Sequence, residues 1–408
     1  MRANGSDELQ DRGSEVSGDE DVPFRRHLGS LFFLAAIFFL NFISRIILGP
    51  LMPTMEEDMN LGHGEAGSLF LLISSGYSVV LFFSGAVSSR LTHKRTILLS
   101  SLVMGVTLLL VSQSRSLGAM RLGLVVMGMA GGLYLPSGIA SLTAMVSPRH
   151  WGKAIAIHEL APNIGFVAAP FLSEFLLGCL PWRGILGVIG GASIVVGLGF
   201  ARFGKGGGFS GEAPSVRALR SLTGDPSFWV MMLLFSLAIG GSLGVYAMLP
   251  LYLVSEKGME REWANTLVAV SRITGIGMAF VAGWAVDHLG AKRSMAMAML
   301  GTGLGTLLLG LVPGGWTVAM VFLQPMVAVC FFPAGFSALS RIGGQRTRNV
   351  AVSLTIPVAF LVGGGGIPAW IGFAGEMGSF EAGMVTVGAL TAGSVVLMRY
   401  LRLGKKGE

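Results

Sequence analysis

Two arginines, Arg45 and Arg272, lie inside long apolar stretches of the sequence. A charged group at the centre of a membrane helix costs about 2.5–3.5 kcal/mol on insertion scales, so it usually faces a cavity and has a task there. Asn41 precedes Arg45 by four residues and Asn265 precedes Arg272 by seven, so each amide shares a helical face with its arginine. The planar guanidinium fits carboxylates and phosphates. These four residues therefore predict an anion-binding site.

A second set of polar side chains could carry protons or line the same cavity. His158 and Glu159 fall together in one apolar stretch, and imidazole and buried carboxyl groups both exchange protons readily. We expect Glu159 or His158 to be the proton carrier. Glu174 lies nearer the outer end of the same stretch, where we expect water around it. Tyr134 and Gln324 are the remaining candidates for binding the substrate of the cavity.

The composition explains where these residues must sit. Of 408 residues, 52% are hydrophobic and only 12% are charged, against about 25% charged in soluble domains. This excludes a soluble enzyme, a disulfide-stabilised secreted domain and a disordered chain. No catalytic motif, cofactor fingerprint or metal-ligand spacing is present, and Cys179 and Cys330 are too far apart in sequence to suggest one. We expect no enzyme activity, no cofactor and no metal.

The chain is predicted to be an all-α polytopic membrane protein with twelve transmembrane helices. Each apolar segment has about 18 residues or more, which is enough to cross a bilayer. We estimate their bounds as 28–51, 65–88, 96–113, 119–146, 153–178, 184–203, 227–253, 264–286, 294–312, 316–340, 350–373 and 381–402.

The segments form two related sets of six. Pro136 and Pro333 are 197 residues apart in similar surroundings, and Pro53 and Pro250 share that offset. Internal repeats of this kind are typical of secondary transporters, which bind substrate between the repeats. The predicted divisions are a disordered cytoplasmic tail (1–27), an N-terminal six-helix bundle (28–203), a cytoplasmic linker (204–226), a C-terminal six-helix bundle (227–402) and a cytoplasmic tail (403–408).

The basic residues fix the predicted topology. With a cytoplasmic N-terminus, 22 of the 29 Lys and Arg residues fall on the cytoplasmic side and five on the outer side. Cationic loops remain in the cytoplasm, so both termini are expected there, in a bacterial-type inner membrane. The net charge of +7 is explained by these loops. We expect the lipid bilayer as the surroundings, no nucleic-acid partner and a monomer.

The loops at 85–95 and 283–293 resemble the G-x-x-x-D-R-x-G-R-R motif of the major facilitator superfamily, and the resemblance extends over 28–402. The second copy is the better one, whereas the first has Ser89 for Asp and Thr92 for Gly. The resemblance implies the major facilitator fold of two pseudo-symmetric bundles. It also implies a gating role for the matching residues: Gly85, Arg90, Arg95, Gly283, Asp287, Gly290 and Arg293.

The first two segments are similar to the anion:cation symporter branch of that superfamily. Asn41, Arg45 and Tyr77 match its motifs, and the resemblance implies that they bind the substrate. Ser44 and Gly131 replace the two carboxylates of the branch, and Leu124 replaces its second arginine. Other anion-carrying branches therefore stay open.

Together these features predict a secondary active transporter that moves a small organic anion, such as a carboxylate, with proton symport. In the superfamily, helices 1 and 8 border the central cavity, so Arg45 and Arg272 would hold the anion between the two halves. The alternatives are an anion exchanger, an exporter of lipophilic compounds, and a non-transporting sensor built on a transporter fold.

Overall fold

The computed structural model describes residues 24–211, 223–342 and 348–403. Most of the predicted N-terminal tail, the middle of the predicted linker and nearly all of the C-terminal tail therefore lie outside the described residues. Residues Phe24–His27 form a 3-10 turn, η1, that leads into the first long helix.

We call the part of the chain from Leu28 to Phe203 the N-terminal half, and it is built of helices. Its elements are α1 (Leu28–Ile46), α2 (Leu48–Met59), α3 (His63–Arg90), α4 (His93–Gln113), α5 (Leu117–Gly132), α6 (Tyr134–Met145), η2 (Pro148–His150), α7 (Trp151–Leu177) and α8 (Trp182–Phe203).

The part from Pro226 to Tyr400, which we call the C-terminal half, repeats this plan and adds two π-helical turns, η3 and η4. Its elements are α10 (Pro226–Ile239), η3 (Gly240–Gly244), α11 (Val245–Ser255), α12 (Arg261–Leu289), α13 (Ala291–Leu311), α14 (Gly315–Ala328), α15 (Phe331–Leu339), α16 (Arg348–Ala359), η4 (Phe360–Gly366), α17 (Ile367–Glu376), α18 (Phe380–Gly393) and η5 (Ser394–Tyr400).

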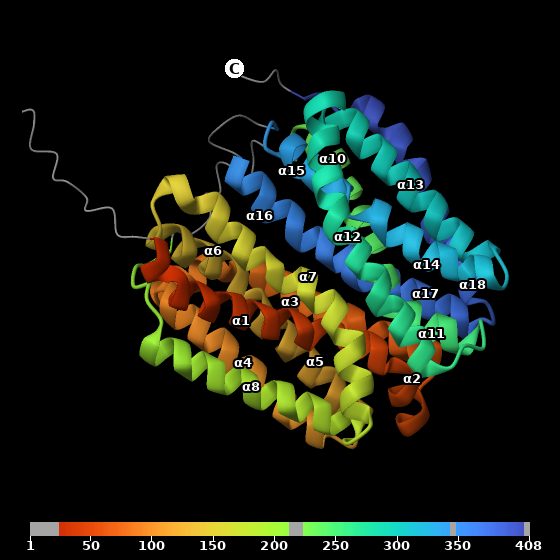
Figure 1. The fold of residues 1–408 in the computed structure, drawn as a ribbon, viewed down its shortest axis with the longest axis horizontal. Helices are drawn as coiled ribbons and strands as arrows, with labels where there is room; N and C mark the ends of the chain where they lie inside the picture. The colour runs from red at the N-terminus through yellow and green to blue at the C-terminus, as the bar shows by residue number, and fades with distance from the viewer. Residues whose placement is uncertain (1–23, 212–222, 343–347, 404–408) are drawn as a thin grey trace, which may run out of the picture.

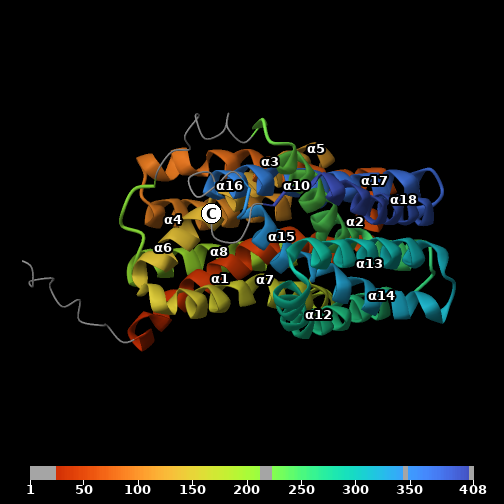
Figure 2. The same ribbon diagram turned by 90° about the horizontal axis from the view of Figure 1, so that it is seen from above.

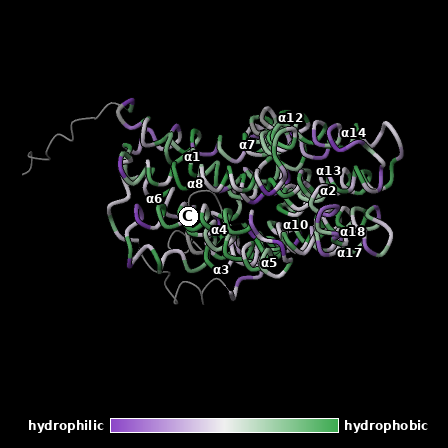
Figure 3. Tube along the Cα trace, turned by 90° about the horizontal axis from the view of Figure 1, so that it is seen from below, coloured by the Kyte–Doolittle hydropathy of each residue, from purple (hydrophilic) through white to green (hydrophobic). Residues whose placement is uncertain are grey.

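The described residues contain eleven helical stretches that are long and apolar enough to cross a membrane. A twelfth is reached if α12, bent by 43° between Arg261–Gly275 and Phe280–Leu289, counts as one span. The prediction of an all-helical membrane protein is confirmed. In Figure 3 most of the helical trace has apolar colours, and hydrophilic colours gather at helix ends.

The two halves pack into separate bundles that meet along one side (Figures 1 and 2). Within the N-terminal half, α3 packs on α5, and α4 packs on α8; within the C-terminal half, α13 packs on α18. Contacts between the halves run through α3 with α17 and η4, α7 with α12, and α2 with α11.

The sequence repeat is visible as a shared pattern of helix breaks. The fourth span of the N-terminal half breaks at Leu133, between α5 and α6, and its counterpart breaks at Cys330, between α14 and α15. The two positions are 197 residues apart, the same offset as the repeated prolines. Equivalent spans are therefore interrupted at equivalent depths.

Candidate functional site

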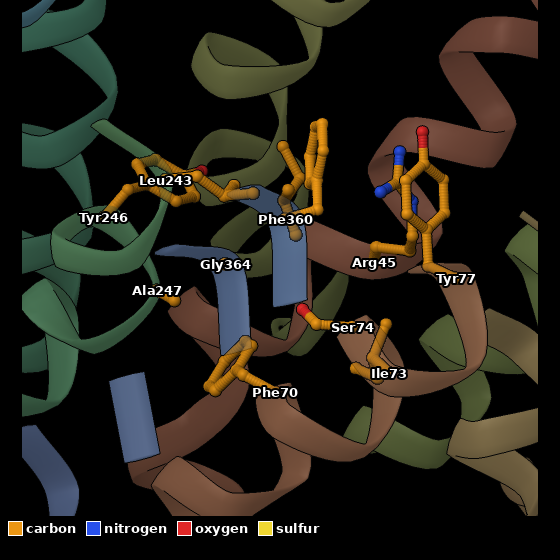
Figure 4. Close-up of a pocket in the computed structure, with 11 residues that line it drawn as sticks. Arg45, Phe70, Ile73, Ser74, Tyr77, Leu243, Tyr246, Ala247, Phe360 and Gly364 are labelled. Carbon is orange, nitrogen blue, oxygen red and sulfur yellow. The ribbon is translucent and has the colours of Figure 1, made fainter. Parts of the chain in front are cut away.

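A cavity lies where the two halves meet, and residues of both halves line it. α1 and α3 contribute from the N-terminal half, and η3, α11 and η4 from the C-terminal half. Figure 4 shows Arg45 and Tyr77 on one side and Leu243 and Tyr246 on the opposite side. The lining residues are Arg45, Ile46, Phe70, Ile73, Ser74, Tyr77, Leu243, Tyr246, Ala247, Phe360 and Gly364.

Arg45 is the charged member of this lining. It is 8% exposed, and its guanidinium carbon lies 4.3 Å from the centre of the Tyr77 ring. Its Nε donates a 3.4 Å hydrogen bond to the backbone oxygen of Asn41, one turn earlier. Within the described part of the chain no carboxylate lies within 4 Å of the guanidinium. Among the described residues, Arg45 is therefore a buried cation that contacts aromatic rings, the Tyr77 hydroxyl and a backbone oxygen.

Asn41 and Tyr77, two further predicted binding residues, lie beside Arg45. The Asn41 amide donates to the Gly131 carbonyl oxygen at 3.3 Å. A β-carbon on Gly131 would lie 3.3 Å from the Tyr77 ring and 3.4 Å from Arg45 Cδ. The glycine is thus what leaves room for the arginine and tyrosine to stack. The structure brings together the three residues that the family resemblance grouped.

Arg272 lies on the other side of the interface and is not among the residues that line the cavity. Its guanidinium carbon is 4.7 Å from the Tyr246 ring centre and 4.9 Å from that of Phe166. Its Nη2 donates to the Ser242 oxygen of η3 at 3.1 Å, while its buried Nε has no partner in the structure. Because Tyr246 does line the cavity, one tyrosine ring connects Arg272 to it.

Gln324 also contacts η3. Its Nε2 donates to the Gly241 oxygen at 2.6 Å and to Thr306 Oγ1 at 3.1 Å. A π-helical turn departs from the i to i−4 bonding of the α-helix, so its carbonyl groups need other donors. Gln324 and Arg272 supply two of them. In the conformation described, Gln324 is 2% exposed and does not line the cavity.

Tyr134 and His158 form a buried pair inside the N-terminal half. The His158 Nε2 lies 3.0 Å from the Tyr134 hydroxyl, which in turn lies 2.7 Å from the Leu34 backbone oxygen. Phe38 stacks on the imidazole at 4.4 Å. Tyr134 is fully buried here and does not line the Arg45 cavity.

The Tyr134 hydroxyl donates to the Leu34 oxygen, which can only accept, so His158 Nε2 is placed to donate to the hydroxyl. His158 Nδ1 lies 3.2 Å from Glu159 Oε1. The imidazole therefore connects the buried Tyr134 hydroxyl to the carboxylate of Glu159.

The structure contradicts the expectation that Glu174 is surrounded by water. Its side chain is only 15% exposed and accepts hydrogen bonds from Arg261 Nε at 3.1 Å and Nη2 at 3.2 Å. The Asn265 amide donates to the same carboxylate at 2.5 Å and to the Pro50 oxygen at 3.1 Å. Arg261 also donates to Thr54 Oγ1 at 3.3 Å. We call Thr54, Glu174, Arg261 and Asn265 the outer latch, because they join the two halves at the side predicted to face outward.

Sequence reasoning missed Glu174 and Arg261 as partners and placed Asn265 with Arg272. The available signal was that opposite charges occur at the outer ends of the fifth and eighth spans. A second contact joins the halves on the same side, where the Gly64 amide donates to the Glu376 carboxylate at 3.1 Å.

The predicted gating residues lie at the other ends of the helices. Arg90, Arg95, Asp287 and Arg293 are exposed, and no ion pair joins them to other described residues. Gly85 and Gly283 lie within α3 and α12. Gly290 has φ +82° and Thr92, at the equivalent position, has φ +114°, so both loops make the same left-handed turn.

Each of these loops is fastened to its own half by a lysine. Lys94 Nζ donates to the Gly204 oxygen at 2.8 Å, directly after α8. Lys292 Nζ donates to the Leu401 oxygen at 3.0 Å, directly after η5. The two lysines are 198 residues apart and perform the same task, since each satisfies a carbonyl at the end of the last span of its half.

Comparison with known proteins places the chain among transporters. The multidrug transporter DTR1 of Candida glabrata is 25% identical over 186 residues, 44% of this chain and only 34% of that protein. The probable sulfoacetate transporter SauU of Cupriavidus necator is 21% identical over 322 residues, which cover 73% of this chain and 75% of that protein.

The fold agrees with a solved transporter structure. A bacterial homologue of the human lysosomal transporter Spinster, solved in an inward-facing and unoccupied conformation, matches with a TM-score of 0.73. The identity is 16%, and the match covers 92% of this chain and 94% of that one. The family model of the Major Facilitator Superfamily matches residues 34–368. The chain therefore belongs to the major facilitator superfamily.

Proposed function

We propose that this transporter moves a small organic anion such as a carboxylate across the inner membrane, with protons as the coupling ion. The observation that carries the proposal is Arg45, a buried cation in a cavity between the halves with no carboxylate partner among the described residues. A buried unpaired charge is costly, and an anionic substrate would supply its partner. The similarity to a probable sulfoacetate transporter supports the same class.

Arg272 would serve as the second positive charge. It packs on Tyr246 at 4.7 Å, and Tyr246 lines the cavity. A shift of η3 that released the Ser242 carbonyl would free its Nη2 for substrate. The two arginines would then hold the anion from opposite halves, together with Asn41 and Tyr77.

The contact between His158 Nδ1 and the Glu159 carboxylate supports proton symport. His158 is 1% exposed and Glu159 has an exposed side chain, so the pair links a buried group to an accessible one. An anion that enters a negative interior costs about 2.3 kcal/mol per charge per 100 mV. An accompanying proton offsets this charge, and the pair is the group in the described bundle best placed to carry it.

Alternating access fits the placement of the contacts between the halves. The outer latch and the bond between Gly64 and Glu376 close the side predicted to face outward. The exposed gating loops lie at the opposite helix ends. We infer an inward-facing arrangement in an inner-membrane monomer with both termini in the cytoplasm. A fluorescent protein fused to the C-terminus should therefore fluoresce in cells; a dark fusion with normal expression would argue for the reverse topology.

Uptake by proteoliposomes tests the anion site. We expect Arg45→Ala and Arg272→Ala each to lower uptake of a simple monocarboxylate by about tenfold or more, the effect of losing about 1.4 kcal/mol. Arg115→Ala, in an exposed loop, is the matched control. If both variants transport anions like the parent, the anion proposal is wrong.

Anion exchange is the second candidate function, because Arg45 keeps its charge throughout the cycle. The Glu159→Gln variant distinguishes proton symport from anion exchange. In a symporter this change should abolish the response of uptake to a pH gradient while counterflow exchange continues. Unchanged pH dependence would favour exchange. The exporter alternative, suggested by the partial match to a multidrug transporter, predicts transport of neutral lipophilic compounds that does not depend on Arg45.

A further inference from the structure

The cavity around Arg45 has two chemically different parts. The guanidinium lies beside the Tyr77 side chain of α3, while Ser74, three residues earlier, adds a hydroxyl to the lining near Gly364 (Figure 4). Apart from Tyr246, whose hydroxyl donates to the Phe166 oxygen, the remainder of the wall is apolar, and both halves build it. Its side chains are Ile46, Phe70, Ile73, Leu243, Ala247 and Phe360. A simple, fully hydrated anion would leave this second part of the wall without a function.

The charges in the wall are also few. Arg45 is the charged residue among the eleven that line the cavity. In the conformation described, Arg272 lies behind Tyr246 with its Nη2 bonded to the Ser242 oxygen; once freed, it would contact the same oxyanionic group as Arg45 and not a second one. A ligand with two charges would have to bury its second charge against apolar side chains, which is unfavourable unless that group is paired.

We propose that the substrate is an amphipathic monoanion, with one oxyanionic group and an aliphatic or aromatic body. This inference rests on the proposed function, in which Arg45 binds the anion. The oxyanion pairs with the Arg45 guanidinium, beside the Tyr77 side chain. The body lies against Phe70 and Ile73 of the N-terminal half and against Leu243 and Phe360 of the C-terminal half. Such a ligand contacts both halves at once.

Binding of straight-chain monocarboxylates to the purified full-length protein, measured by thermal shift, tests the proposal. Stabilisation reports affinity through linkage. From acetate to octanoate, we expect the affinity to rise about fourfold per methylene, since each buried CH₂ contributes about 0.8 kcal/mol. Octanedioate should bind roughly tenfold or more weakly than octanoate. 1-Octanol, which lacks the charge, reports non-specific insertion and should show no dependence on Arg45.

The outcomes separate this proposal from the proposed function. If anions bind through Arg45 but the affinity is flat with chain length, or octanedioate binds as well as octanoate, the amphipathic class is wrong and the anion site stands. If Arg45→Ala leaves every affinity unchanged, the proposed anion site fails as well.

Two phenylalanines of α3 give a matched pair of variants. Phe70 lines the cavity and is 4% exposed, whereas Phe83 on the same helix is 57% exposed. Phe70→Ala should flatten the dependence of affinity on chain length, and Phe83→Ala should leave it as in the parent. Leu243→Ala, from the opposite wall, gives the same test if Phe70→Ala does not fold. Parent-like dependence in both cavity variants would overturn the proposal.

Discussion

At the scale of single residues, the packing of Arg45 depends on Gly131, a neighbour that has no side chain. Gly131 stands where the similar symporter branch has a carboxylate, and a β-carbon there would lie 3.4 Å from Arg45 Cδ. A glutamate at this position would reach the guanidinium and pair with it. We predict that Gly131→Glu lowers anion affinity by roughly tenfold or more, because the substrate must then displace an internal carboxylate.

Gly131→Ala is the control for that variant. It adds the same β-carbon, which requires a small shift of Tyr77 and Arg45, but it adds no charge. Equilibrium binding of the same anion to both variants separates charge from crowding. Equal losses in the two variants would show that packing alone explains the effect.

The Tyr134 hydroxyl orients the His158 imidazole through its contact with Nε2. Tyr134→Phe removes that contact, so a neutral imidazole can place its hydrogen on Nδ1, facing Glu159. Since we propose that His158 and Glu159 carry the coupling proton, we predict that the pH profile of uptake by Tyr134→Phe differs from that of the parent.

The Tyr252→Phe variant controls for the loss of a buried hydroxyl. Tyr252 also donates to a helix carbonyl, that of Leu309 at 2.8 Å, far from His158 in the other half. The pH profile of uptake by Tyr252→Phe should match that of the parent. A parent-like profile in Tyr134→Phe would show that the tyrosine does not fix the imidazole hydrogen.

At the scale of elements, the turn between α12 and α13 has a backbone that glycine alone adopts without strain. Gly290 combines φ +82° with ψ 156°, and an added β-carbon meets no atom within 4 Å. We predict that Gly290→Ala destabilises the protein by about 1–3 kcal/mol through backbone strain alone.

Gly283, in the same loop motif but inside α12, gives the contrast. It has an open β-carbon position and helical surroundings, so Gly283→Ala should be neutral or slightly stabilising. Thermal unfolding in detergent measures both. Equal changes in the unfolding temperature of the two variants would mean that Gly290→Ala introduces no backbone strain.

The spans and the buried arginine could be predicted from the sequence because both depend on local features. An apolar helix of about 18 residues is long enough to span a bilayer. The i, i+4 spacing puts Asn41 and Arg45 on one helical face. The Glu174 and Arg261 pair could not be predicted, since the residues are 87 positions apart and meet only when the halves pack. The π-helical turn η3 likewise has tertiary donors, Gln324 and Arg272. These donors resembled free binding groups when only the sequence was considered.

At the scale of the whole molecule, transport requires the closed outer side to open. The α3 and α17 ends lie close there: a β-carbon on Gly64 would be 3.7 Å from Glu376 Cβ, which is the separation of two β-carbons joined by a disulfide. We predict that Gly64→Cys with Glu376→Cys, in a background where Cys179 and Cys330 are serine, forms a disulfide on oxidation. Uptake should fall to the level of empty liposomes, because the halves can no longer separate on this side.

Reduction of that disulfide should restore uptake, and the single Gly64→Cys variant should transport under both conditions. Ligand binding should survive oxidation, since the Arg45 cavity is present in the conformation that the disulfide fixes. Loss of transport with retained binding is the signature of a blocked conformational cycle rather than a damaged site. If the cross-linked protein transports at the parent rate, the outer latch lies on a side that stays closed, and the substrate must pass by another route.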